Sequence, residues 1–129
     1  MYIVLSLMRE EHSSKDSDTC MFVRDVLRST LRDLLGLSGA TALENFLNKR
    51  LGDDMYLVFC NSPYRFYDAL KGFLGKGADA ILKIVAVKLI ERGSLSEISP
   101  EEFVELVKNP NKDSWKKLHT YFKAGDLDD

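Results

Sequence analysis

The sequence has few of the residues from which disulfide frameworks, metal sites and most catalytic sites are built. Its 129 residues include two cysteines and two histidines, and no pair among them has metal-ligand spacing. Two cysteines do not make a disulfide framework. Cys20 and Cys60 both adjoin apolar residues, so we expect both to be reduced and partly buried, as in a cytoplasmic protein. No metal and no cofactor are expected.

The chain also lacks a bias of charge and a long apolar run at its start. Its 18 basic and 20 acidic side chains give a formal net charge of -2, whereas nucleic-acid-binding proteins usually carry a basic excess or stripe. Residues 1–8 are apolar but too few to cross a membrane, and they lack the features of a signal peptide. We therefore expect no targeting segment and no membrane partner, and nucleic acid is not favoured as a partner.

Candidate catalytic residues are scarce. His12 lies in a polar segment, and His119 lies in the last expected helix, where a surface or cap role is expected. The acidic residues Asp126, Asp128 and Asp129 are typical of a solvated chain end rather than of a metal site. We expect no catalytic residues and no enzymatic activity.

The most apolar long segment, residues 77–93, is the feature around which the fold is expected to be organised. Its apolar residues repeat at helical spacing, and further apolar residues widen the stripe so far that the helix needs neighbours on most sides. A buried parallel strand is the alternative. The length, the alanines, the bounding glycines and the spacing of Asp79 and Lys83 favour a helix. The repeat consists of Ala78, Ile81, Leu82, Val85 and Leu89.

Apolar stripes with start or stop signals indicate further helices on both sides of this segment. Ser62 and Ser99 each precede a proline, which places a cap before the first helical residue. The segment 55–60 is short and rich in β-formers, and both a strand and a helical or extended connector stay open for it. The expected flanking helices cover residues 19–35, 38–51, 63–74, 100–108 and 111–122.

These segments predict an all-α fold, a single-domain bundle of about six helices built from helical hairpins around the central apolar helix 77–92. Residues 1–18 are expected to be a flexible extension, because residues 9–19 contain no aliphatic or aromatic side chain. The helical domain is expected to span residues 19–124, and residues 125–129 form an acidic tail.

Two segments, residues 34–43 and 73–81, share a frame of an apolar pair, a glycine, a short corner, Gly-Ala-x-Ala and an aliphatic residue. The frame predicts two helical hairpins that turn at Gly36 and Gly75, because glycine permits a positive φ. Chance is the alternative, since alanine and glycine are common. The similarity is compatible with an internal duplication.

Residues 31–43 resemble the turn of a DNA-binding helix-turn-helix, with Gly36 at the corner. That motif requires a small residue at the position that Arg32 occupies here. The positions that would read bases, residues 39–41, hold glycine, alanine and threonine, which lack the side chains for this task. A helix-turn-helix-like nucleic-acid-binding regulator is therefore an alternative function.

The aromatic part of the helix expected at residues 63–74 is the candidate ligand or partner surface. Its members are Tyr64, Arg65, Phe66, Tyr67 and Phe73. The competing interpretation is that these residues belong to the core and its rim. A further alternative is a sensor with a dry apolar pocket for a small ligand, walled by Phe66, Phe73, Ile81 and Val85.

A hairpin expected at residues 35–51 is followed by a characteristic order of features from Ser62 to Leu82. This order is Ser-Pro, an aromatic-bearing helix, an apolar-Gly-x-Gly-Ala corner and a long apolar helix. Over residues 20–92 this order resembles the Nitrosopumilus output domain, a family of small all-helical archaeal domains. Its members occur alone or as output modules of signalling proteins. The resemblance implies an all-α fold and a regulatory role, and it supplies no catalytic residues.

We therefore expect a non-catalytic regulatory or protein-interaction module. Six short helices with broad apolar stripes leave apolar edges uncovered, which favours pairing with a second copy in a homodimer or with another protein. The alternative is a monomer in which residues 1–8 or 55–60 cover the apolar edges of the helices.

Overall fold

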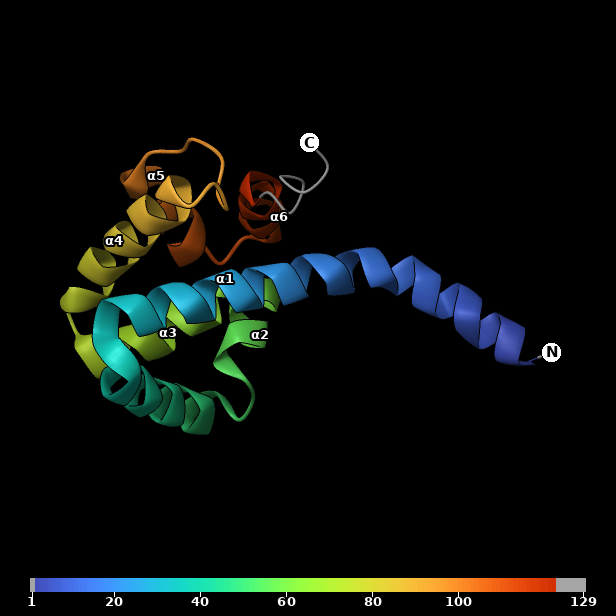
Figure 1. The fold of residues 1–129 in the computed structure, drawn as a ribbon, viewed down its shortest axis with the longest axis horizontal. Helices are drawn as coiled ribbons and strands as arrows, with labels where there is room; N and C mark the ends of the chain where they lie inside the picture. The colour runs from blue at the N-terminus through green and yellow to red at the C-terminus, as the bar shows by residue number, and fades with distance from the viewer. Residues whose placement is uncertain (1, 123–129) are drawn as a thin grey trace.

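Residues 2–122 fold into six α-helices that are joined by short connections (Figure 1). The structure, a computed structural model, describes residues 2–122, with the side chains of residues 19–122. No β-strand occurs within residues 2–122, which hold a single isolated bridge between Leu95 and Phe122. The predicted all-α bundle of six helices is confirmed. The helices are α1 (Tyr2–Leu51), α2 (Met55–Asn61), α3 (Pro63–Leu74), α4 (Gly77–Glu91), α5 (Pro100–Lys108) and α6 (Lys112–Tyr121).

The long helix α1 consists of two arms that meet at a sharp bend. Gly36 has φ 76° and ψ 168°, a backbone conformation outside the helical region that side chains with a Cβ atom rarely adopt. The two arms correspond to the helices expected at residues 19–35 and 38–51. Gly75, at the corner between α3 and α4, also has a positive φ, of 59°. Both glycine corners predicted from the shared frame are therefore present.

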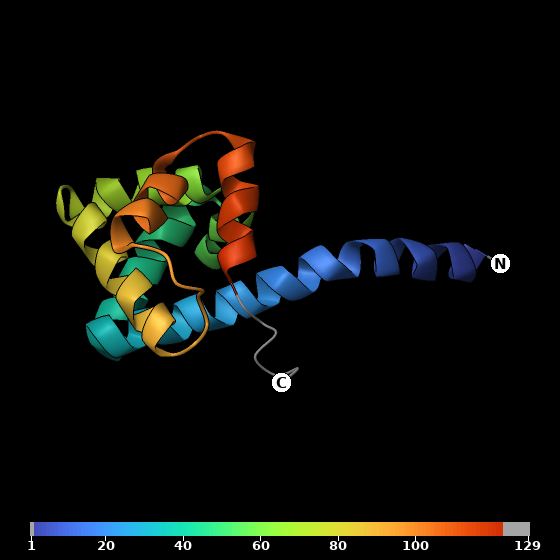
Figure 2. The same ribbon diagram turned by 90° about the horizontal axis from the view of Figure 1, so that it is seen from above.

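Helix α1 starts earlier than the helix that was expected at residues 19–35. The backbone of residues 2–18, expected to be a flexible extension, is helical and projects away from the bundle (Figures 1 and 2). Residues 2–35 contain neither glycine nor proline, so nothing in this stretch breaks a helical backbone. The expected acidic tail, residues 125–129, lies outside the described residues.

Helix α4 buries one face completely. This face packs against α1, α3 and α5, and each of its side chains is at most 1% exposed. On the opposite face, Ile84 is 46% exposed and Val87 is 41% exposed. The helix therefore lacks the neighbours on most sides that its composition led us to expect. The buried residues are Ala78, Leu82, Val85, Ala86 and Leu89.

The short segment 55–60 is helical and forms most of α2, which removes the strand alternative. Asp54 caps this helix, because its carboxylate accepts a hydrogen bond from the backbone N–H of Tyr56 at 2.8 Å. The Phe59 ring packs edge-to-face on Phe66 of α3, with 5.1 Å between the centroids, and on Phe122 at 6.4 Å. The aromatic contacts thus join α2 to α3 and to the end of α6.

The predicted start signal of α5 lies where the sequence placed it, and α6 begins next to the expected position with a cap that was not predicted. The Ser99 hydroxyl accepts a hydrogen bond from the N–H of Glu102 at 3.0 Å, and the Asn111 side chain accepts one from Asp113 at 2.8 Å. Ser62 precedes Pro63 at the start of α3, but its side chain makes no capping bond. At that start the fixed φ of proline provides the local signal.

Arg92, directly after α4, ties the end of this helix to the first arm of α1. Its Nη1 donates a hydrogen bond to Oγ1 of Thr30 at 2.9 Å, and its Nη2 pairs with the Asp33 carboxylate at 2.6 Å. Thr30 is fully buried, so the guanidinium supplies the partner that its hydroxyl needs.

The substitution Val85→Asp tests the buried face of α4. Val85 is fully buried, so the carboxylate would enter the core without a partner. We expect the free energy of unfolding to fall by about 3 to 5 kcal/mol. Ala80→Asp is the matched control, because it introduces the same carboxylate at an exposed position of the same helix, and we expect it to cost less than about 0.5 kcal/mol. Urea denaturation followed by circular dichroism measures both, and equal losses would contradict the assignment of the two faces.

Candidate functional site

The two cysteines form a disulfide that links α1 to α2. The Cα atoms of Cys20 and Cys60 lie 5.6 Å apart, although 40 positions separate them in the chain. The prediction that both cysteines are reduced was wrong. Apolar neighbours in the sequence indicated burial, and Cys60 is only 1% exposed, but they carry no information about which segments the bend at Gly36 brings together.

A hollow of about 340 Å³ opens beside this disulfide, between α1, α2 and α6. Both sulfur-bearing residues contribute to its wall, and Lys112 and Lys116, one helical turn apart on α6, supply two positive charges. Among the described residues, none of those that line it is acidic. The hollow is therefore a cationic surface around a disulfide. Its lining consists of Cys20, Cys60, Asn61, Lys112, Trp115, Lys116 and His119.

His119 places a polar side chain close to the buried sulfur of Cys60. Its Nε2 lies 2.7 Å from the carbonyl oxygen of Cys60 and 3.7 Å from the Cys60 sulfur. A carbonyl oxygen only accepts hydrogen bonds, so the geometry assigns a proton to Nε2, which donates to it. The sequence predicted a surface or cap role for His119 and missed this contact with α2. The side chain of His12, the other histidine, lies outside the described residues.

The remaining contacts of α6 hold the wall of the hollow in place. The indole Nε1 of Trp115 donates a hydrogen bond to the Asn109 carbonyl at 3.1 Å. Lys117 pairs with Glu102 of α5 at 3.3 Å. These contacts attach α6 to the end and the side of α5, and they fix the position from which His119 reaches the disulfide.

The residues predicted as a ligand or partner surface all lie on α3 but do not share a face. They are Tyr64, Arg65, Phe66, Tyr67 and Phe73. Consecutive helical residues are about 100° apart, so the first four surround the helix. Tyr64 and Arg65 are exposed, whereas Phe66 and Tyr67 are buried. Arg65 reaches back to the second arm of α1, where its Nη2 donates to the Leu51 carbonyl at 3.4 Å.

The four residues named for an apolar pocket are divided between the core and its edge. Phe66 and Val85 are at most 1% exposed and belong to the packed core, while Ile81 lies at its boundary. Phe73 is 39% exposed, and its ring packs against Phe46 with 4.7 Å between the centroids. None of the four lines the hollow at the disulfide.

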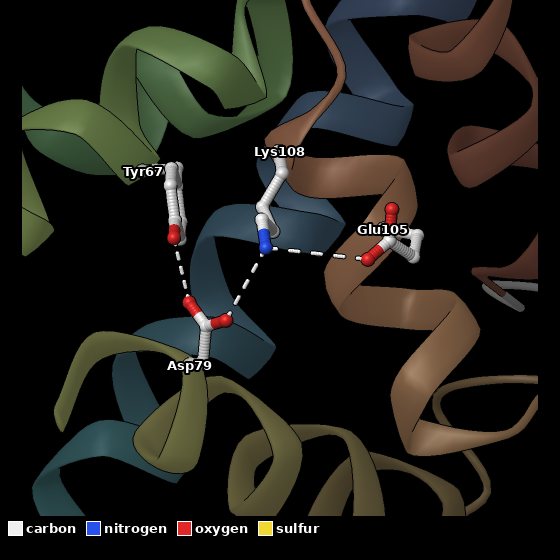
Figure 3. Close-up of polar contacts among 4 residues, drawn as sticks. All are labelled: Tyr67, Asp79, Glu105 and Lys108. Atoms are coloured by element: carbon white, nitrogen blue, oxygen red, sulfur yellow. Dashed lines mark hydrogen bonds and ion pairs between the residues drawn. The ribbon is translucent and has the colours of Figure 1, made fainter. Parts of the chain in front are cut away.

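A polar network centred on Asp79 connects three helices (Figure 3). The Tyr67 hydroxyl of α3 donates to Oδ1 of Asp79 at 2.6 Å, and Nζ of Lys108 from α5 donates to Oδ2 at 3.3 Å. Lys108 also lies 4.0 Å from the Glu105 carboxylate and 5.7 Å from the centre of the Tyr67 ring. The ammonium group therefore faces two carboxylates and an aromatic ring at once.

This network shifts two pKa values in opposite directions. Burial, together with the hydrogen bond to Asp79, raises the pKa of Tyr67 to about 12. The hydrogen bond from Tyr67 lowers the pKa of the Asp79 carboxyl, and the charge of Lys108 adds to this effect, while partial burial opposes it. At neutral pH the network therefore holds a neutral phenol and a charged carboxylate. In these states the hydrogen bonds and the ion pair join α3, α4 and α5.

Tyr56 and Glu44 repeat this arrangement between α2 and the second arm of α1. The Tyr56 hydroxyl donates to Oε2 of Glu44 at 2.6 Å. Burial, followed by this hydrogen bond and the glutamate charge, raises the pKa of Tyr56 well above its usual range. The phenol stays protonated at neutral pH and serves as a donor.

A row of arginines follows the first arm of α1. Arg24, Arg28 and Arg32 stand four residues apart, so they share one side of the helix. Their Nε atoms are buried and have no hydrogen-bond partner among the described residues, although the Nε of Arg32 lies 3.9 Å from the Glu44 carboxylate. A second hollow, of about 420 Å³, lies between Arg28 and Arg32 together with Asp25, Ser29 and Asp33. Acidic side chains thus partly offset the positive charge of the row.

No group of three or more His, Cys, Asp or Glu side chains in the described part of the chain is close enough to hold a metal ion. No helix within residues 2–122 combines the length and the apolar composition that crossing a membrane requires.

No family model, no curated protein and no solved structure matches this chain.

The substitution Asp79→Asn tests the role of the carboxylate charge in the network around Asp79. The pKa of Asp79 is lower in the folded than in the unfolded protein, so its carboxylate stabilises the fold above about pH 4, and this contribution is lost as the pH falls through the folded pKa. We expect the substitution to lower the free energy of unfolding by about 0.5 to 1 kcal/mol at neutral pH. The difference from wild type should shrink toward zero at about pH 2.

Urea denaturation at several pH values measures this effect. Asp68→Asn is the matched control, since it removes an exposed carboxylate from α3, and we expect no measurable change. An Asp79→Asn effect that is equally large at acidic and neutral pH would show that shape, and not charge, accounts for the role of Asp79.

Proposed function

We propose that this chain is a non-catalytic helical regulatory module that acts by pairing the outer face of α4 with a protein surface, first of all that of a second copy. The observation that carries the proposal is the exposure of Ile84 and Val87 on this face. The two side chains stand one turn apart and form one strip. Scattered exposed apolar residues are ordinary, but these two adjoin each other on α4, whose composition is strongly apolar.

The surroundings of this strip suit an interface. Lys83, Lys88 and Glu91 are exposed on the same helix and give the apolar strip a charged border, which is the usual arrangement of an interface core and rim. Two α4 helices packed antiparallel around a two-fold axis at Val87 would place Lys83 of each copy opposite Glu91 of the other. The charges then complement each other, so a second copy fits the face.

The resemblance of residues 20–92 to the Nitrosopumilus output domain points in the same direction. That family includes output modules of signalling proteins, whose role is regulatory. The polar networks around Asp79 and Glu44 support the non-catalytic part of the proposal, because each consists of a protonated phenol and a carboxylate that join helices. Neither network contains an activated nucleophile.

A nucleic-acid-binding regulator is the second candidate, and the arginine row of α1 favours it. Three guanidinium groups at one-turn spacing suit a phosphate backbone. Asp25 and Asp33 beside the row weaken its field. Of the residues that would read bases in a helix-turn-helix, Ala40 is 1% exposed. Salt-dependent retention on DNA, lost in Arg28→Gln, would favour this candidate over pairing through α4.

Sedimentation equilibrium across the micromolar range tests the pairing through α4. We expect the average mass of the wild type to rise with concentration toward that of a dimer. The double substitution Ile84→Asp with Val87→Asp should weaken association by at least about tenfold, because two charges would enter the apolar strip. Both positions are exposed, so the helical circular dichroism spectrum should be unchanged.

Leu37→Asp is the matched control for this experiment. Leu37 is 69% exposed, lies at the bend of α1 and has no place in the strip, so its substitution should leave association as in the wild type. A wild-type protein that sediments at monomer mass over the whole range would remove the support for self-pairing.

A further inference from the structure

The disulfide between Cys20 and Cys60 lies at an accessible hollow rather than inside the core. Cys20 is partly exposed, whereas Cys60 is 1% exposed, so an incoming molecule reaches the Cys20 sulfur first. The hollow measures about 340 Å³, which is within the size range of small-molecule sites, about 300 to 1,000 Å³. This position differs from that of a disulfide that serves only as a buried crosslink.

From this geometry we infer that the disulfide is a thiol-exchange site for a low-molecular-weight thiol that carries carboxylate groups. Lys112 and Lys116 border the hollow with two positive charges, and no acidic residue is among the described residues that line it. An anionic thiol is attracted to such a surface, whereas a cationic thiol is repelled. Trp115 adds an apolar wall to the same hollow. The site is independent of the outer face of α4.

The exchange step is balanced without any oxidant. The incoming thiol first loses its proton to water, and the thiolate attacks the Cys20 sulfur. A new sulfur–sulfur bond forms between the thiol and Cys20, and the bond between Cys20 and Cys60 breaks. The electron pair of the broken bond leaves with the Cys60 sulfur as a thiolate.

His119 is placed to stabilise the leaving sulfur. Its protonated Nε2 is 3.7 Å from the Cys60 sulfur and already donates to the Cys60 carbonyl. When negative charge develops on the sulfur, a short approach of this N–H gives a charge-assisted hydrogen bond. Asn61, whose side-chain amide lies 4.0 Å from the Cys20 sulfur, borders the point of attack. His119 thus favours attack on Cys20, because this attack releases the Cys60 thiolate, which His119 stabilises.

The first experiment uses the oxidised wild-type protein and three thiols. Millimolar glutathione, 2-mercaptoethanol and cysteamine represent an anionic, a neutral and a cationic thiol. The reaction is quenched with acid, and intact mass and peptide mapping report the adduct. We expect one glutathionyl group on Cys20 and a free Cys60. After correction for intrinsic thiolate reactivity, glutathione should react about threefold to tenfold faster than cysteamine.

The second experiment uses variants. Lys112→Gln with Lys116→Gln should abolish the preference for glutathione, whereas Lys83→Gln with Lys88→Gln, the matched control on α4, should keep it. His119→Phe should slow exchange about tenfold with all three thiols, because the leaving thiolate loses its donor. Circular dichroism establishes that each variant is folded.

Three results would overturn the inference. The first is a disulfide that stays intact in millimolar thiol, which would make it a structural crosslink only. The second is an adduct on Cys60 in place of Cys20. The third is equal corrected rates for the three thiols in the wild type, a result that needs no variant and is therefore independent of whether the variants fold.

Discussion

The change of direction at Gly36 is the constraint on which the rest of the fold depends. A straight α1 of 50 residues would be about 75 Å long, and its two halves could not face the same core. The bend lets both arms bury their apolar stripes in one core. The first arm contributes Val23, Leu27 and Leu31, and the second contributes Leu43 and Leu47. Helices α2 and α3 then pack against the bent α1 and against each other.

Most of this architecture could be predicted because the signals for it are local. A stripe at helical spacing, a serine cap and a glycine with positive φ act within a few residues, so Ser99 and Gly36 were identified from the sequence. The short segment 55–60 was ambiguous, since six apolar residues show no period. The exposed side of α4 was missed for a related reason: composition shows that a helix is apolar, but only the positions of its neighbours determine which apolar residues stay outside.

The candidate site could not be predicted because its members are joined by tertiary contacts. Asp79 was noted for its spacing from Lys83, yet its carboxylate binds Lys108, 29 positions away. Tyr67 was noted as a surface aromatic, yet its ring is buried and its hydroxyl binds Asp79. The approach of His119 to Cys60 spans 59 positions. No spacing rule covers such distances, and an even number of cysteines was the only signal of the disulfide that the sequence contained.

The disulfide also makes residues 20–60 a closed covalent ring. The ring contains the bend at Gly36, the second arm of α1 and most of α2, while α3 to α6 lie outside it. The exposed connection at Gly52 and Asp53 lies within the ring, and such connections are preferred points of proteolysis. A single cut there opens the ring without releasing a fragment, so the oxidised chain keeps its mass apart from one added water. The same cut in the reduced chain separates α1 from all the helices that it supports.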